Sequence, residues 1–431
     1  MRLEIQPQLT CPSCWSKLDP AELLWISSHP DLRGDPYLGS DTLKRFLPSR
    51  FDVEGFALDA KGLRCQGLAC PRCHLVIPRT LVEVKPIFIS ILGAPASGKS
   101  YFIASCIWEL RKRLRRFQVS FADADPVANQ IISRYEQKLF LNEQPSQFVA
   151  LPKTELEGEL YQLVNFGDRQ ELYARPFVFN LRPTSEHSSS RRKSDVRLAS
   201  RALCLYDNAG EHFQPSLESE LSPATDHLSL SEALLYIFDP LQHPRFRTRC
   251  RDFSRDPQLG EEFRCYRQDE VLLEAAKRIR QKANMAQHEQ IRQPLVVIVN
   301  KYDVWRPLLP DIDLRQCDPF YPLADGTLGL DLRVVNEVSR QTRALLENTA
   351  PEIIAACDSF GSDVTFVPAS PQGCSPERQQ TGDAVALGVR PSQIDPLWAD
   401  VPLLYGMGRA KCSLIPTIEA KHNSTHDGTG R

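Results

Sequence analysis

From residue 86 onward, short apolar runs alternate with longer amphipathic stretches. The runs at 87–92, 202–206, 233–238, 295–299 and 364–367 have the length and composition of buried strands. Such alternation is typical of βα units that build a mostly parallel sheet. The pattern therefore predicts an α/β fold in which this sheet is flanked by helices.

Two segments refine this prediction. After the first strand the apolar positions have helical spacing, so one helix face, expected to be core, carries Phe102, Ile103, Cys106, Ile107 and Leu110. Farther along, extended stretches at 171–181 and 196–206 flank a polar segment at 188–193. These stretches predict two more strands, joined by a flexible loop.

Residues 1–84 differ from the rest because they are rich in proline, glycine and aspartate and show little helical periodicity. They contain two Cys-Pro-x-Cys pairs, Cys11 with Cys14 and Cys70 with Cys73. The turn formed by this spacing directs both thiolates of a pair toward one ion. Four thiolates make a closed tetrahedral site that suits structural zinc, although spacing alone leaves iron open.

The long segment between the pairs, 15–69, leaves alternatives for this site. Cys65 or His74 could replace one of the four ligands, or the two pairs could be unrelated knuckles or free thiols. The segment lacks a cluster of basic and aromatic residues, so protein contact or stabilisation is favoured over nucleic-acid binding as the role of a zinc module.

Composition adds expectations about the class of protein. The formal net charge is −2, with 42% hydrophobic and 25% charged residues, so charge gives no case for a dedicated nucleic-acid or anionic-membrane binder. The start of the chain has no apolar signal segment, and the longest apolar runs are strand-sized. The 13 cysteines include tight pairs only at metal-ligand spacing. A cytoplasmic protein without a membrane span is expected.

Residues 93–100 match G-x-x-x-x-G-K-[ST] between an apolar strand and a helix, a context that disfavours a chance match. In such a loop Gly98 lets the backbone approach phosphates, Lys99 reaches the β- and γ-phosphates, and Ser100 ligates magnesium. The nucleotide contacts expected here are Gly93, Ala96, Ser97, Gly98, Lys99, Ser100 and Tyr101.

A phosphate loop also needs a carboxylate at the end of a neighbouring strand to hold the hydrated magnesium ion. Asp207 follows the run 202–206 and forms, with Gly210, a D-x-x-G sequence whose glycine N–H can contact a γ-phosphate. The alternative is an aspartate that only closes a strand at a turn.

The N-K-x-D sequence of Asn300, Lys301 and Asp303 follows the strand candidate 295–299. A carboxylate there can accept hydrogen bonds from N1–H and the 2-amino group of guanine, whereas adenine would leave it unpaired against a lone pair. We expect the stem of Lys301 to lie along the base and Asn300 to tie this loop to the phosphate loop. After the last strand, Ala369 and Ser370 are expected to bring a backbone N–H near guanine O6.

The phosphate loop, the D-x-x-G sequence and the N-K-x-D sequence follow one another in this order. Together they resemble the translation-factor and Ras-like (TRAFAC) class of P-loop GTPases, over roughly residues 86–417. Within that class the chain looks most like bacterial double-GTPase-type domains, and its N-terminal part resembles a zinc ribbon. The resemblance implies a zinc-ribbon-like module at 1–84, a P-loop GTPase domain at 85–420 and a disordered tail at 421–431.

The resemblance also implies roles in hydrolysis. Thr154 is expected to close over magnesium as a switch threonine, and a loop threonine without that role is the alternative. Glu211 stands where Ras-like proteins place a water-orienting glutamine, so intrinsic hydrolysis is expected to be slow, to use His212 or to need an arginine. The run 243–251 could supply that arginine, and a solvated basic loop is the favoured alternative.

These expectations define a magnesium-dependent switch that binds and hydrolyses GTP, with Lys99, Thr154 and Glu211 as catalytic residues. Magnesium would be held by Ser100, Thr154 and Asp207, and a protein partner or activator is expected to contact the zinc module. The alternatives are a guanine-nucleotide-binding scaffold without turnover, and a zinc-ribbon nucleic-acid adaptor regulated by nucleotide.

Overall fold

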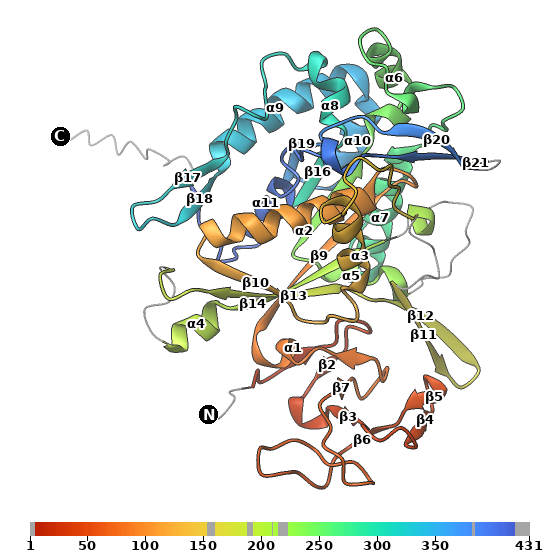
Figure 1. Cartoon of the computed structure of the whole chain (residues 1–431), viewed down its shortest axis with the longest axis vertical. Helices are drawn as coiled ribbons and strands as arrows, with labels where there is room; N and C mark the ends of the chain where they lie inside the picture. The colour runs from red at the N-terminus through yellow and green to blue at the C-terminus, as the bar shows by residue number, and fades with distance from the viewer. Residues whose placement is uncertain are drawn as a thin grey trace.

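A computed structural model describes residues 5–152, 160–187, 193–208, 210–213, 223–381 and 384–418. A large sheet with surrounding helices forms most of the structure, and the N-terminal segment, made of short strands, lies below it in Figure 1. The structure is therefore a mixed α/β fold, as the sequence predicts.

The main sheet has seven strands in the order β10-β13-β14-β9-β15-β16-β19. The strands from β14 to β19 run parallel, whereas β13 is antiparallel to both of its neighbours. All five predicted strands are present, as β9, β14, β15, β16 and β19. The bounds are β9 (Lys85–Gly93), β10 (Val119–Asp123), β13 (Phe177–Pro183), β14 (Arg201–Asp207), β15 (Ala233–Phe238), β16 (Leu295–Val299) and β19 (Val364–Pro368).

Helices cover both faces of this sheet, which is why its central strands are apolar along their whole length. A Cβ on Gly406 would meet Ala233 and Leu235, so one face of β15 packs on α11. Tyr236 points to the opposite face, where its hydroxyl donates to the first residue of α7, Gln268, at 2.5 Å. The larger helices are α2 (Lys99–Arg116), α3 (Gln130–Leu139), α7 (Gln268–Lys282), α9 (Leu332–Thr349), α10 (Pro351–Phe360) and α11 (Val401–Arg409).

Smaller elements surround the main sheet. The short helices are α4 (Lys193–Ala199), α5 (His227–Leu230), α6 (Pro244–Cys250) and α8 (Tyr302–Trp305). The additional strands are β11 (Tyr161–Phe166) with β12 (Arg169–Ala174), β17 (Phe320–Pro322) with β18 (Leu328–Asp331) and β22 (Thr417–Ile418), and β20 (Glu377–Thr381) with β21 (Ala384–Gly388). The predicted apolar face of α2 is buried, including Cys106.

The prediction of two strands at 171–181 and 196–206 is partly wrong. The first stretch is divided between β12 and β13, and the break falls at Pro176, which has no N–H for a strand ladder. The second begins as the helix α4 and becomes a strand only at Arg201. A single turn of apolar residues does not distinguish helix from strand by period, so the sequence alone did not place this boundary.

The N-terminal segment is built from short strands and one short helix, in keeping with its weak periodicity. Its elements are β1 (Leu9–Thr10), β2 (Lys17–Leu18), β3 (Leu24–Ile26), β4 (Arg33–Asp35), β5 (Gly39–Leu43), β6 (Arg45–Phe46), β7 (Leu68–Ala69), β8 (Val76–Ile77) and α1 (Thr80–Glu83). The buried apolar residues of this segment are continuous with the core of the main sheet.

Three aromatic residues dock the N-terminal segment on the main sheet. The ring of Trp15 packs edge-on against Phe88 of β9 at a centroid distance of 4.7 Å and lies 5.4 Å from Tyr206 of β14. The Tyr206 hydroxyl donates to the carbonyl of Pro12 at 2.5 Å. Because Pro12 lies between Cys11 and Cys14, this bond attaches the first cysteine pair directly to the sheet.

Within the described ranges, no helix combines the length and apolar character that a membrane crossing requires.

We expect Tyr206→Phe to lower the free energy of unfolding by about 1–2 kcal/mol, because the buried carbonyl of Pro12 loses its donor while the ring stays in place. Urea unfolding followed by tryptophan fluorescence measures the change. The exposed Tyr321 gives the matched control, Tyr321→Phe. Equal stability of the two variants would contradict this docking role.

Candidate functional site

A cavity of about 550 Å³ opens at the carboxyl ends of the parallel strands. Its walls come from segments far apart in the sequence: 95–101, 150–152, 256–266, 300–304, 370–376 and 386–387. Ligands of open α/β sheets bind at this edge. The expected phosphate loop and the expected base loop therefore line one cavity.

The loop that follows β9 has a backbone suited to close approach by a ligand. Gly98 has φ of +89°, a left-handed conformation, and directly precedes α2. A Cβ at this position would lie 2.9 Å from Asn300 Nδ2. Glycine is required at this position for both reasons. The N–H groups at the start of α2 supply partial positive charge next to the cavity.

Asn300 joins the loop after β16 to the loop after β9. Its Nδ2 donates to the carbonyl of Ser97 at 2.8 Å, and its Oδ1 accepts from the N–H of Lys301 at 2.8 Å. Trp305 Nε1 in turn donates to the carbonyl of Asn300 at 2.7 Å. This is the link between the two loops that the sequence predicts.

Lys99 carries the cation of the loop and is only 7% exposed. Its Nζ donates to the carbonyls of Gly93 at 3.2 Å and Ala94 at 3.3 Å. The ammonium group is thus held by neutral acceptors at the loop. Ser100 and Tyr101 line the cavity beside it, and the Tyr101 hydroxyl accepts from the N–H of Leu151 at 3.1 Å.

The D-x-x-G sequence lies against the same loop. Asp207 ends β14, in register with Ile91 of β9. A Cβ on Gly210 would come within 2.5 Å of the Gly93 carbonyl oxygen and 2.6 Å of Pro95 N, so the backbone at Gly210 packs directly on the phosphate-loop backbone. Thr154 lies outside the described residues, and Glu211 is described by its backbone alone, in the short helix η3 (Gly210–Phe213).

Asp303 and Lys301, which follow β16, also line the cavity. Burial raises the pKa of Asp303 to about 6, and the Ser370 hydroxyl, which donates to Asp303 Oδ1, offsets part of that rise. Lys301 Nζ forms an ion pair with Asp239 Oδ2. This ion pair holds the far end of the Lys301 side chain and extends its methylene stem along the cavity wall.

The backbone N–H groups expected near guanine O6 have acceptors within the protein. The N–H of Ala369 donates to the carbonyl of Val299 at 3.1 Å, and that of Ser370 donates to Leu397 at 2.9 Å. The Ser370 side chain lines the cavity, whereas Ala369 is not among the lining residues of the described chain. For either N–H to donate to guanine O6, its present hydrogen bond within the protein would have to break.

Several residues of this site were missed at the sequence level. Asp239 directly follows β15 and is fully buried, so its place at a strand's carboxyl end could have identified it. Gln242 binds the phosphate loop, since its Nε2 donates to the Pro95 carbonyl at 3.1 Å. Asp256, Phe263 and Tyr266 line the cavity from a segment without a recognisable sequence pattern.

The basic run 243–251 is neither a solvated loop nor, in this structure, a source of an arginine at the cavity. It folds into α6, which His243 caps. Arg247 is only 7% exposed and donates to the carbonyls of Leu241 at 2.7 Å and Phe263 at 2.9 Å. These bonds give Arg247 a structural role in holding the segment that lines the cavity, and no residue of the run is among the described lining residues.

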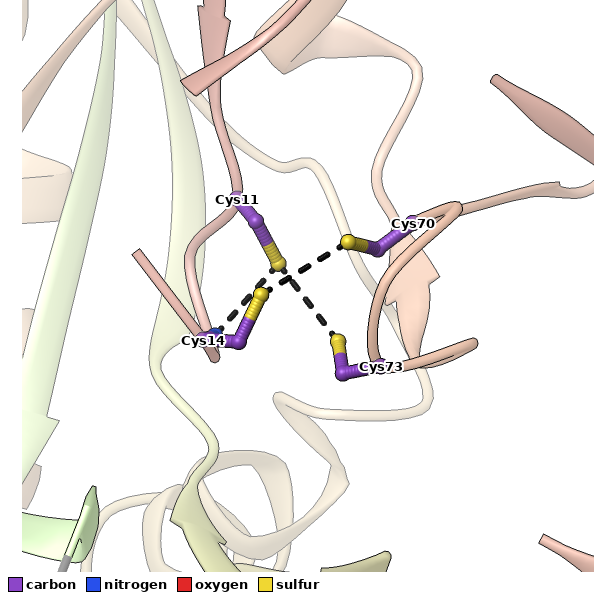
Figure 2. Close-up of side chains that lie close together, drawn as sticks. All are labelled: Cys11, Cys14, Cys70 and Cys73. Atoms are coloured by element: carbon purple, nitrogen blue, oxygen red, sulfur yellow. Dashed lines mark hydrogen bonds between the residues drawn. The ribbon is translucent and has the colours of Figure 1, made fainter. Parts of the chain in front are cut away.

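The four cysteines of the two Cys-Pro-x-Cys pairs point toward one another in Figure 2. All four Sγ atoms lie within 4.8 Å of one another; Cys11 and Cys73 are 3.8 Å apart, and Cys14 and Cys70 are 3.6 Å apart. Metal–sulfur bonds of about 2.3 Å in a tetrahedron place sulfur atoms about 3.8 Å apart. The cluster could therefore hold a tetrahedral metal ion.

The two pairs have nearly the same backbone geometry. The N–H of Trp15 donates to the Cys11 carbonyl at 3.1 Å, and the N–H of His74 donates to the Cys70 carbonyl at 3.0 Å. Both residues have positive φ, 61° for Trp15 and 60° for His74. In each pair a backbone N–H also points at a sulfur, from Ser13 to Cys11 and from Arg72 to Cys70, both at 3.4 Å. Such donors stabilise thiolates.

The two alternative ligands lie outside this cluster. Cys65 Sγ faces the carbonyl of Leu63 at 3.6 Å. His74 Nδ1 is 2.7 Å from Asp35 Oδ2, and the converging ligand atoms of the cluster do not include His74. The described side chains with metal-ligand geometry are therefore Cys11, Cys14, Cys70 and Cys73.

No protein family model matches the chain. The chain is 26% identical over 263 residues to the putative ESX-1 scaffolding and assembly protein SaeC of Mycolicibacterium smegmatis; the match covers 56% of this chain and 60% of that protein. Among solved structures it is similar to sup35 complexed with GDP and with GMPPNP, at 12% identity and TM-scores of 0.23 and 0.22. Each match covers 67% of this chain and 38% of that chain. Scores this low carry no argument about the chain.

We expect purified protein to contain about one tightly bound metal ion per chain, because four converging thiols form a closed site. Cys14→Ser should release most of this metal, as measured by plasma mass spectrometry. Cys65→Ser is the control, since Cys65 is a buried cysteine of the same segment but is not part of the cluster. The same metal content in both variants would contradict the assignment.

Proposed function

We propose that this chain is a magnesium-dependent GTPase, which binds GTP in the 550 Å³ cavity and hydrolyses it to GDP and phosphate. One observation carries the proposal: the glycine-rich loop and the Asn300 to Asp303 loop line the same cavity and are joined by the bond from Asn300 to Ser97. Triphosphate and base thus have separate sites, connected by a short rigid link.

The phosphate end supplies positive charge and backbone donors. The loop N–H groups and the start of α2 bind phosphate oxygens, and Lys99 Nζ exchanges its two carbonyl acceptors for the β- and γ-phosphates. Magnesium would be held by Ser100, Thr154 and Asp207, and it would neutralise charge that develops on the phosphates. Gly210 donates its N–H to the γ-phosphate.

The base end selects guanine. Ionised Asp303 accepts hydrogen bonds from N1–H and the 2-amino group, whereas adenine presents a lone pair at N1. Lys301, fixed by Asp239, lays its stem along the base. A site built around buried hydrogen bonds rejects bases that leave those groups unpaired.

A γ-phosphate would act on the segment that follows β14. Gly210 packs on the phosphate loop, and Asn208 Oδ1 lies 3.1 Å from His227 Nε2. The His227 ring stacks on Tyr206 at 4.4 Å, and Tyr206 binds Pro12 in the first cysteine pair. These contacts support a switch whose nucleotide state is transmitted to a zinc-holding module that contacts a protein partner.

A second candidate is a nucleotide-dependent scaffold without turnover. Two observations favour it: Glu211 lacks the amide donor of the glutamine it replaces, and one relative is named as a putative scaffolding and assembly protein. Single-turnover assays with GTP, with and without cell extract as a source of activator, separate the candidates. Phosphate release above the uncatalysed rate supports the GTPase, and its absence in both assays supports the scaffold.

We expect Asp303→Asn to weaken GTP and GDP binding by about 100-fold or more, because an amide presents a donor where guanine also donates. ATP binding should remain at its low level. Isothermal calorimetry measures both, and Asp311→Asn, on the exposed surface after α8, is the control. An unchanged preference for guanine over adenine would exclude Asp303 as the base-recognising residue.

The raised pKa of Asp303 predicts a pH dependence of guanine binding. Asp303 must be ionised to accept, and its unliganded pKa is about 6, so affinity is retained at pH 7 and lost as the pH falls through 6. We expect the dissociation constant for GDP to rise about tenfold between pH 7 and pH 5 beyond the change seen in Asp303→Asn, which keeps the other titrating groups and lacks only this carboxylate. Parallel profiles for the two proteins would contradict the prediction.

A further inference from the structure

Asp256 places a second buried carboxylate in the wall of the proposed nucleotide cavity. It precedes the short helix η6 (Pro257–Leu259), and its Oδ1 accepts from the N–H of Gln258 at 2.8 Å, which caps that helix. The residue is 4% exposed, and its Oδ2 is buried without a partner at hydrogen-bonding distance among the described residues. Burial raises the pKa of Asp256, and the Gln258 N–H and the nearby Ser375 hydroxyl offset part of that rise. A buried acceptor without a donor is costly, so its retention calls for a ligand.

Two arginine side chains hold the segment that follows Asp256. Arg251 donates from Nε and from a terminal guanidinium nitrogen to the Leu259 carbonyl, at 3.2 and 3.0 Å. Arg247 holds the next turn through the Phe263 carbonyl at 2.9 Å. Arg247 belongs to α6 and Arg251 directly follows it, so these bonds attach the segment after Asp256 to the end of that helix.

Asp256 and Asp303 both line the cavity, and the charge of Asp256 affects Asp303. Burial is the largest cause of the raised pKa of Asp303, and the negative charge of Asp256 adds to it. Cys374, which also lines the cavity, has its pKa raised to about 11 by burial first and then by the negative charges of nearby carboxylates, which are Asp303, Glu377, Asp256 and Asp395 in that order. Two acceptors therefore face one end of the site.

Guanine offers more donors at this end than one carboxylate can accept. It carries three N–H bonds on this edge, one at N1 and two on the 2-amino group. Asp303 accepts N1–H and one amino hydrogen in the proposed complex, which leaves the other amino hydrogen inside a desolvated cavity. A carboxylate oxygen without a donor is the complementary group.

We propose that Asp256 Oδ2 accepts the remaining N–H of the guanine 2-amino group, so that the amino group is held between two carboxylates. This inference rests on the proposed binding of guanine at Asp303. It adds a specificity that Asp303 alone does not give. Inosine nucleotides, which lack the amino group, leave Asp256 unpaired, and xanthine nucleotides place an oxygen against it.

The variant Asp256→Asn tests this contact with little other change. The N–H of Gln258 requires an acceptor, so the amide oxygen stays at the helix cap and the amide NH₂ takes the place of Oδ2. Dissociation constants for GDP, IDP and 2′-deoxy-GDP are measured by calorimetry in wild type and variant. Asp252→Asn, on an exposed position of the same segment, is the matched control.

We expect Asp256→Asn to weaken GDP binding by at least about tenfold and to leave IDP binding within about twofold, so that the preference for GDP over IDP collapses. The ratio of GDP to 2′-deoxy-GDP affinity should not change. Equal losses for GDP and IDP, or a changed ratio for the deoxynucleotide, would overturn the proposal, since they indicate a general or a ribose contact.

The wild-type protein separates this inference from the proposed function. If wild type prefers GDP to ADP and Asp303→Asn abolishes that preference, while Asp256→Asn retains the full preference for GDP over IDP, only the role of Asp256 is excluded. If wild type binds GDP no better than ADP, the proposed function fails, and the role of Asp256 fails with it.

Discussion

The hydrogen bond from Asn300 Nδ2 to the Ser97 carbonyl is the constraint on which the candidate site depends. It joins the ends of β9 and β16, which are separated in the sheet by β15. Its short distance also explains Gly98, because any side chain there would displace the Asn300 amide. Without this bond the two loops would move independently, and the distance between phosphate and base sites would not be fixed.

The cysteine cluster depends on a second contact, which is made by strand β14 of the same sheet. Tyr206 donates to Pro12 inside the first cysteine pair, and the next residue in the chain is Asp207. Adjacent residues of a strand point to opposite faces, so a shift of β14 moves both groups together. The stacking of Tyr206 on His227, and the contact of His227 with Asn208, extend this coupling into the D-x-x-G segment.

The features that the sequence predicted correctly are those that leave a local pattern of residues along the chain. Apolar runs located the parallel strands because strands buried on both faces are mostly apolar. The spacing of Cys11, Cys14, Cys70 and Cys73 located the cluster because each pair forms its own turn. The helix α4 was mistaken for strand because seven residues carry too few turns to show a period. Asp256 could not be found, since its place in the cavity follows from the path of a long connection after β15.

The buried carboxylates of Asp303 and Asp256 bear both on the stability of the empty cavity and on the proposed recognition of guanine. Burial raises the pKa of both Asp303 and Asp256, so each is less favourable as an ion in the empty cavity than in water. Ser370 donates to Asp303, whereas Asp256 Oδ2 has no donor among the described residues. In the proposed complex, a base with three N–H donors satisfies both groups. Guanine then gains affinity from acceptors that are unfavourable without it, and a base with fewer donors leaves that unfavourable burial in place.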